Sequence, residues 1–337
     1  MMNTFSQGLN RQLATTKWIT SVPFICVAAA ILAVLLVGSE FWISTLTFAA
    51  IYGIAAVGLN IVSGFAGQMS FGTTMFMALG GYLSAILTTR YDVNAWLALA
   101  LGAAIAAGLA FVIGVPVMRL KAHYFGLATF GMALSAVSVT TGATVTGGPS
   151  GIVGVPGLPG GALRLEDPRH YYVFVWAVLA GCALVASRVR ISRTGRAWSA
   201  IASREDVAAS LGVRVRSYKV KAFVVSAILG ALAGSLYVHF TSFVAPDVFN
   251  VDAAIQIFAM VYIGGLATVT GPLIGTLLVV SLPALSYGLQ DWSQIGIQLL
   301  LLVILVVAPK GLAQAGQLLV PRQSARPRTR TMAGGEI

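Results

Sequence analysis

The chain has 337 residues, of which 58% are hydrophobic and 9% are charged. Because an average soluble domain carries roughly 25% charged residues, this composition excludes an ordinary water-soluble protein. The net charge of +11 does not indicate nucleic-acid binding, since the basic residues gather at the ends of apolar runs and in one loop, as in membrane proteins. The sequence therefore predicts an all-α, polytopic integral membrane protein.

Apolar runs between charges and turn signals predict about ten transmembrane helices, since a spanning helix needs about 20 apolar residues. The expected ranges are 19–38, 42–62, 72–89, 95–118, 124–144, 171–187, 222–242, 253–267, 272–288 and 293–308. The apolar run from 253 to 290 is divided in two, because Gly264-Gly265 and Gly271-Pro272 favour a turn inside it.

The distribution of basic residues predicts that both termini are cytoplasmic. With the N-terminus inside, all but three of the 21 basic residues fall on the cytoplasmic side, and the exceptions are Arg90, Arg164 and Arg169. This asymmetry follows the positive-inside rule. The expected organisation is a cytoplasmic N-terminal segment at 1–18, a transmembrane domain at 19–313 and a basic cytoplasmic tail at 314–337.

The loop expected outside the membrane, 145–170, is rich in glycine and proline. Five glycines stand at every third position from Gly148 to Gly160, too few and with too little proline for a collagen-like strand. We expect a compact irregular loop. The functional alternative is a docking surface for a partner outside the membrane.

The inner loop, 188–221, is predicted to contain two short amphipathic helices. The first is expected from Gly195 to Ala202, with Thr194 as its N-cap and with Trp198 and Ile201 on one side. These helices lie either on anionic lipid headgroups or against another polypeptide.

The second inner helix is expected to begin with Ser203 and Asp206, whose spacing resembles a capping box. Gly212 stands where the helix would end with a left-handed residue. The predicted apolar face consists of Val207, Ala208 and Leu211.

Neutral polar residues and glycines gather in one stretch, which contains Asn60, Ser63, Gly64, Gly67, Gln68, Ser70, Gly72, Thr73 and Thr74. Non-helical backbone at membrane depth is tolerated only where protein or a water-filled cavity surrounds it, and a glycine-broken counterpart lies at 264–275. The stretch is therefore expected to line a translocation path, with Asn60, Ser63, Gly67, Gln68, Ser70 and Thr73 as its lining. The alternative is close helix packing, which is preferred for the GxxxG pairs Gly230/Gly234 and Gly271/Gly275.

The expected transmembrane ranges contain one Asp, Glu, Lys, Arg or His side chain, His239. Ion-coupled carriers usually need a buried ionisable group, so that class loses support. No catalytic or metal-ligating motif indicates an enzyme, and no cofactor is expected. Because no Gly-Lys dipeptide is present, a Walker A loop is absent. If transport is active and not ion-driven, ATP must be hydrolysed on another chain, and loop 188–221 is the expected contact surface.

The run from Gly58 to Gly72, GLNIVSGFAGQMSFG, resembles the GLN-x-x-x-G-x-AGQ-x-S-x-G signature of permease subunits of branched-chain (hydrophobic) amino acid ABC transporters. Further blocks resemble the same family at Tyr124–Thr129 with Thr146–Gly151, in the loop from Gly195 to Gly212, at Tyr262–Gly275 and at Pro309–Leu312. The resemblance extends from about residue 45 to 313, and is closer to the longer of the family's two permeases.

The resemblance implies a bacterial inner-membrane importer of branched-chain or related amino acids. Two permeases would form the pore, two cytoplasmic ATP-binding subunits would hydrolyse ATP, and a periplasmic binding protein would deliver the solute. The residues implied in coupling to the ATPase are Arg204, Glu205, Asp206, Ala208, Ala209, Leu211 and Gly212.

The chain departs from the family pattern at two places. Ser203 stands where an Ile-like or Leu-like residue is common, and Gly148–Gly151 lacks a frequent acidic residue, which leaves amides and urea open as solutes. The alternative function is a passive facilitator or secondary carrier for a small polar solute.

Overall fold

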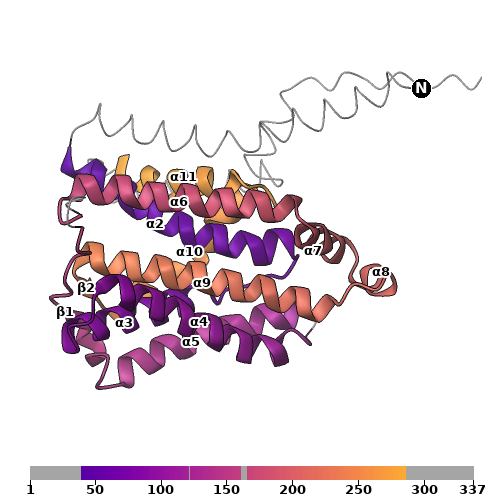
Figure 1. The fold of residues 1–337 in the computed structure, drawn as a ribbon, viewed down its shortest axis with the longest axis horizontal. Helices are drawn as coiled ribbons and strands as arrows, with labels where there is room; N and C mark the ends of the chain where they lie inside the picture. The colour runs from indigo at the N-terminus through magenta and orange to yellow at the C-terminus, as the bar shows by residue number, and fades with distance from the viewer. Residues whose placement is uncertain (1–38, 121, 161–164, 286–337) are drawn as a thin grey trace, which may run out of the picture.

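The computed structural model describes residues 39–120, 122–160 and 165–285, which form a bundle of helices (Figure 1). The expected spans 19–38 and 293–308, the end of 272–288, the N-terminal segment and the basic tail lie outside these described residues. Each expected span between residues 42 and 267 overlaps a helix of the structure.

The long helices of the bundle are α2 (Glu40–Asn60), which continues into the π-helix η1 (Ile61–Phe65), α3 (Thr73–Arg90), α4 (Ala95–Val117), α5 (Ala122–Gly142), α6 (Pro168–Ile191), α9 (Val215–Thr241), α10 (Val251–Gly264) and α11 (Gly271–Leu285). The short helices α7 (Arg193–Ser203) and α8 (Glu205–Ser210) follow α6 and lie at one end of the bundle (Figure 1). The strands β1 (Ile152–Val153) and β2 (Phe243–Val244) lie at the opposite end. They pair antiparallel, with Ile152 opposite Val244.

Within the described ranges, six helical segments are long and apolar enough to cross a membrane. They are Glu40–Phe65, Ala95–Val117, Tyr124–Gly142, Pro168–Ile191, Val215–Thr241 and Pro246–Gly264. The division expected inside 253–290 is confirmed, because α10 ends at Gly264 and α11 begins at Gly271. The last of these segments joins α10 to the 3-10 helix η4 (Pro246–Phe249).

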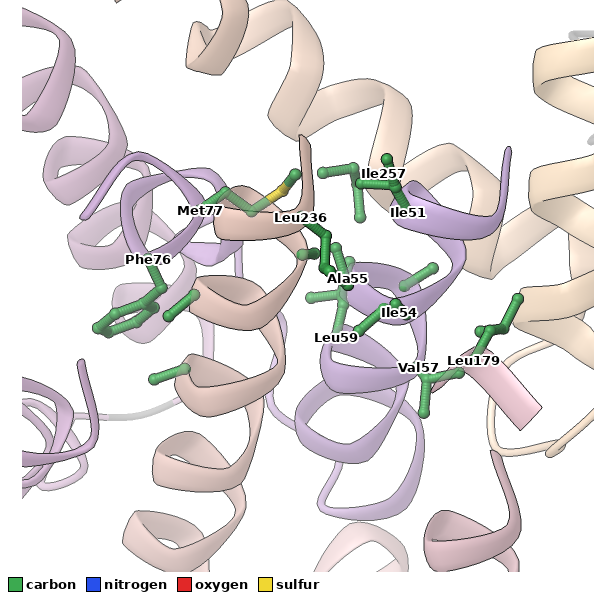
Figure 2. Close-up of a cluster of buried hydrophobic side chains, with 14 of the residues drawn as sticks. Ile51, Ile54, Ala55, Val57, Leu59, Phe76, Met77, Leu179, Leu236 and Ile257 are labelled. Atoms are coloured by element: carbon green, nitrogen blue, oxygen red, sulfur yellow. The ribbon is translucent and has the colours of Figure 1, made fainter. Parts of the chain in front are cut away.

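The helix α2 lies at the centre of the bundle and packs against α6, α9, α10 and α11. Figure 2 shows Ile51, Ile54 and Leu59 of α2 among side chains of these neighbours, including Leu179 of α6 and Leu236 of α9. A helix surrounded in this way has no need of a polar face, which agrees with the largely apolar sequence of α2.

Small residues allow the helices of the bundle to pack closely. The helix α4 buries small residues at every fourth position, namely Ala98, Gly102, Ala106, Ala110 and Gly114, and packs along α9. A side chain on Gly234 of α9 would overlap the Met77 carbonyl of α3, and one on Gly275 of α11 would overlap the Met260 carbonyl of α10. The packing interpretation of both GxxxG pairs is thus supported.

The described part of the outer loop is irregular and anchored to the end of α9. His239 Nδ1 lies 2.7 Å from the Pro156 carbonyl oxygen and must be the donor, because a carbonyl can only accept. In the neutral imidazole Nε2 is then the acceptor, and it accepts from Ser84 Oγ over 2.8 Å. His239 therefore joins the loop to α9 and α3. Positive φ angles in four of its glycines account for the irregular course, at Gly147, Gly148, Gly151 and Gly154.

Candidate translocation and coupling site

The two glycine-broken stretches meet through the side chain of Asn60. Its Oδ1 accepts from the Ala267 backbone N–H over 3.0 Å, and its Nδ2 donates to the Thr268 carbonyl over 2.7 Å. The Asn60 side chain is 2% exposed, so both bonds are buried. Because every buried backbone polar group needs a partner, Asn60 stabilises the non-helical segment between α10 and α11, where Ala267 has a positive φ of 60°.

The other residues expected along the path lie in or next to the turn from η1 to α3. Ser63, Gln68, Ser70 and Thr73 are all buried. Gln68 Nε2 donates to the carbonyls of Ala66 and Gly67, over 3.4 and 3.3 Å, so its amide stabilises the turn itself. The hydroxyls of Ser63 and Thr73 have no hydrogen-bond partner among the described residues.

Gly67 joins this turn to the inner loop. It has a positive φ of 69°, and a side chain there would approach the Cα of Ala202 in α7 to 2.9 Å. Glycine is thus required both by its backbone conformation and by the close approach. The contact shows that the turn lies at the end of the bundle that carries α7 and α8.

The helix α7 is longer than expected and has a different cap. It begins at Arg193, and Ser192 is its N-cap, with Ser192 Oγ accepting from the Gly195 N–H over 3.3 Å. The prediction of Thr194 as the cap is wrong, because the helix starts before it. Trp198 and Ile201 are both buried on one side, as expected, and Trp198 Nε1 donates to the Tyr218 carbonyl over 2.8 Å.

The start of α8 also differs from the prediction. Ser203 is the last residue of α7 and its hydroxyl donates to the Ser199 carbonyl over 2.9 Å, so it is not available to cap α8. The N-cap of α8 is Arg204, without a side-chain cap bond. The expected capping box of Ser203 and Asp206 is therefore wrong, because the hydroxyl bonds back within α7.

The end of α8 agrees with the prediction. Gly212 has a φ of +81°, and the N–H groups of Gly212 and Val213 donate to the carbonyls of Ala209 and Ala208 over 3.0 and 3.1 Å. This pair of bonds is a Schellman motif. The left-handed residue terminates α8 and directs the chain into α9.

The apolar side chains predicted to form one face at α8 differ in burial. Ala208 is buried, whereas Val207 is 47% and Leu211 77% exposed. At about 100° per residue the three positions lie within one arc of about 100° around the helix axis, and only Ala208, at one edge of this arc, packs inward. The predicted face is therefore divided between the bundle, which buries Ala208, and the surface, which exposes Val207 and Leu211.

An ion pair joins α8 to α9. Lys219 Nζ lies 2.6 Å from Glu205 Oε2, with the Lys219 side chain 1% exposed and the Glu205 side chain 48% exposed. A buried ammonium is costly unless it is paired, so Glu205 compensates the charge of Lys219 and links α8 to α9. Asp206, the other acid of α8, forms no ion pair among the described residues.

Comparison with known families identifies the chain. A family model described as "Branched-chain amino acid transport system / permease component" matches residues 41–308. The chain belongs to this family. It is a multi-pass membrane protein and a transporter subunit, not an enzyme.

Individual relatives agree with this membership. The high-affinity branched-chain amino acid transport system permease protein LivM of Escherichia coli (strain K12) is 30% identical over 295 residues, covering 80% of this chain and 69% of LivM. Permease protein LivH of Salmonella typhimurium is 27% identical over 293 residues, covering 79% of this chain and 92% of LivH. A probable LivM of Methanocaldococcus jannaschii is 25% identical over 265 residues. No solved structure matches this chain.

The identity is higher with LivM of Escherichia coli than with LivH of Salmonella typhimurium, which agrees with the expected resemblance to the longer, LivM-like permease. Two residues of the candidate site could not be identified from the sequence. Lys219 looks like one more basic residue of a cytoplasmic loop, and no local pattern indicates that it is buried against Glu205. Ala202 has no polar group, so only the structure reveals its contact with Gly67.

Proposed function

We propose that this chain is the permease subunit of an ATP-binding-cassette importer for branched-chain or related amino acids, located in a bacterial inner membrane with both termini in the cytoplasm. The family membership over residues 41–308 carries the proposal. The proposed partners are a second permease subunit, two cytoplasmic ATP-binding subunits and a periplasmic solute-binding protein.

The proposed contact with an ATP-binding subunit is α8 with its flanking residues. Val207 and Leu211 present an exposed apolar pair at the end of the bundle, beside the exposed Arg204, Asp206 and Ala209. Apolar side chains grouped with charged ones at an exposed helix are typical of a protein interface. Gly212 fixes the end of this helix, and Glu205 attaches it to α9 through Lys219.

Coupling to the path is proposed to run through α7. The contact between Ala202 and Gly67 places the last turn of α7 against the turn between η1 and α3. A displacement of α8 would move α7, since one residue, Arg204, separates them. Such a movement would reach the turn without passing through a flexible linker.

The translocation path is proposed to pass beside Asn60, Ser63, Gly67, Gln68, Ser70 and Thr73, at the interface with the second permease. The unpartnered hydroxyls of Ser63 and Thr73 support this role, because a buried hydroxyl without a partner is costly unless a solute, water or another subunit supplies one. Asn60 acts by positioning the segment between α10 and α11.

The exposed faces of α4 and α5 support this placement. The exposed large side chains of α4, such as Leu101, Ile105 and Val112, are apolar, which is typical of lipid contact. The exposed face of α5 also carries large apolar side chains, namely Leu127, Leu134 and Val139. It differs from that of α4 in the exposed Ser135 and Ser138, whose hydroxyls donate to carbonyls one turn earlier and can still accept. We place the second permease and the path on the α5 side.

The test is to tag this chain in its native membrane, solubilise the membrane gently and identify stoichiometric partners by mass spectrometry. The proposal predicts ATP-binding subunits together with a second polytopic permease. A chain that purifies alone, under conditions in which known membrane complexes survive, contradicts the proposal and favours a passive facilitator.

A further inference from the structure

A cavity of about 890 Å³ opens between α4, α6, α7 and α9, away from the residues of the candidate path. This volume lies within the range of roughly 300–1,000 Å³ typical of small-molecule sites. Its apolar wall includes Phe111, Val189, Val220 and Val224, and its basic rim consists of Arg214, Arg216 and Lys221. We refer to it as the basic pocket.

The positive charges of the rim are not neutralised within the described part of the chain. No Asp or Glu lines the basic pocket, and the ion pairs found among the described residues involve none of its three cations. Arg216 Nε and Nη2 donate to the Val115 carbonyl over 3.1 and 2.6 Å. Lys221 Nζ lies 5.2 Å from the ring centroid of Tyr218. These contacts orient the cations and leave their charge available to an anion.

The basic and apolar lining residues of α9 are partly separated along the helix. Lys221 lies between Val220 and Val224, but its Nζ reaches back over the ring of Tyr218, about one turn nearer the start of α9. Arg214 and Arg216 stand at its first turn, and Val220 and Val224 follow toward the middle of the bundle. At about 1.5 Å per residue, Arg214 and Val224 are roughly 15 Å apart along the helix axis. A phospholipid presents its phosphate and then its acyl chains in this order, starting from the membrane surface. A free phosphate would contact the basic rim but would leave the apolar wall without a ligand group packed against it.

We propose that the basic pocket binds an anionic phospholipid of the cytoplasmic leaflet, with its phosphate at Arg214, Arg216 and Lys221 and its upper acyl chains against Val220 and Val224. The assignment to the cytoplasmic leaflet rests on the proposed orientation, but the binding itself does not depend on the transport function. Trp198 of α7 also lines the pocket. The bound lipid therefore contacts the base of the α7 and α8 pair.

The test uses the full chain in its purified complex, reconstituted in nanodiscs. A photoactivatable phosphatidylglycerol, with its reactive group on an acyl chain, is titrated against a phosphatidylcholine analogue, and labelled peptides are located by mass spectrometry. One variant, Arg214→Gln/Lys221→Gln, removes two rim charges. Its control, Arg188→Gln/Arg193→Gln, removes two exposed charges of the same side that do not line the pocket.

We expect saturable labelling of the 220–225 region by the anionic lipid in preference to phosphatidylcholine. Two charges near a membrane surface contribute enough to weaken binding about thirtyfold when they are lost, and the control pair leaves binding unchanged. Val224→Trp, which fills the apolar wall, abolishes labelling, whereas Leu101→Trp on the exposed face of α4 does not. Val224→Trp and Leu101→Trp therefore test the proposal even if the charge variants fail to fold.

Three results would overturn the proposal. Equal labelling by the two lipids would show that charge does not select the ligand. An equal loss in the control pair would show a general effect of surface charge. Labelling confined to other peptides would show that a segment of this chain or another protein occupies the pocket.

Discussion

Glu205→Gln tests whether the ion pair with Lys219 fixes α8 on α9. The substitution keeps the shape of the side chain and removes its charge, which leaves the ammonium of Lys219 buried without its partner. Removing one partner of a fully buried ion pair costs roughly 3–5 kcal/mol. Because Glu205 is 48% exposed, solvent screening reduces this cost, and we expect about 1–3 kcal/mol.

The assay is amide hydrogen exchange of residues 205–213, detected by mass spectrometry in nanodiscs. The backbone bonds that end α8, such as Val213 N–H to the Ala208 carbonyl, report its local opening. A loss of 1–3 kcal/mol corresponds to exchange about 5- to 150-fold faster. The matched control is Asp206→Asn, which removes a neighbouring charge that has no ion pair among the described residues.

The double variant Glu205→Gln/Lys219→Met completes a double-mutant cycle. Replacing a buried ion pair by uncharged residues of similar volume is often neutral, so protection of α8 should return toward that of the native chain. Three results would refute the role of the ion pair. They are unchanged exchange in Glu205→Gln, an equal increase in exchange in Asp206→Asn, and effects of Glu205→Gln and Lys219→Met that simply add in the double variant.

Three further substitutions test the site. Gly212→Val should reduce ATP-coupled uptake while the chain still inserts into the membrane, because a β-branched residue resists a φ of +81° and no atom within 4 Å would otherwise obstruct a side chain. The backbone strain is about 1–2 kcal/mol and should be smaller in Gly212→Asn. Unchanged uptake in Gly212→Val would contradict the coupling role of α8. Gln68→Leu should impair uptake but leave co-purification of the ATPase intact, and loss of assembly would favour a packing role. Asn60→Leu leaves the Ala267 N–H and the Thr268 carbonyl buried without their partner, so the thermal stability of the purified complex should fall. Asn60→Asp keeps the acceptor but buries a carboxylate against the Thr268 carbonyl, so it should not restore stability. An Asn60→Leu variant as stable as the native chain would contradict this role.

The helical bundle follows from the sequence because its signals are local. Glycine and proline at 264–272 divide an apolar run wherever it lies in the bundle, and Gly212 ends α8 because few other residues adopt a left-handed conformation. These features depend on the chain's own backbone and need no knowledge of the neighbours.

Features that depend on tertiary contacts could not be predicted. Asn60 appeared as a residue of the path lining, but its amide binds a segment 207 residues away. The hydroxyl of Ser203 bonds within α7 because that helix extends beyond its expected end. The inward position of Ala208 depends on how α8 packs under the bundle. In each case the local sequence is compatible with more than one arrangement of the side chain, and contacts outside the local pattern determine which one forms.

The proposed function requires that this chain moves its solute only with ATP hydrolysed on partner subunits. The most direct measurement is uptake of radiolabelled leucine, isoleucine and valine into proteoliposomes that contain the purified complex, with ATP on the side of the ATP-binding subunits and binding protein on the other. We expect uptake against a gradient that stops when ATP, this chain or the ATP-binding subunits are omitted. Solute flux down its gradient through this chain alone, unaffected by ATP, would contradict it.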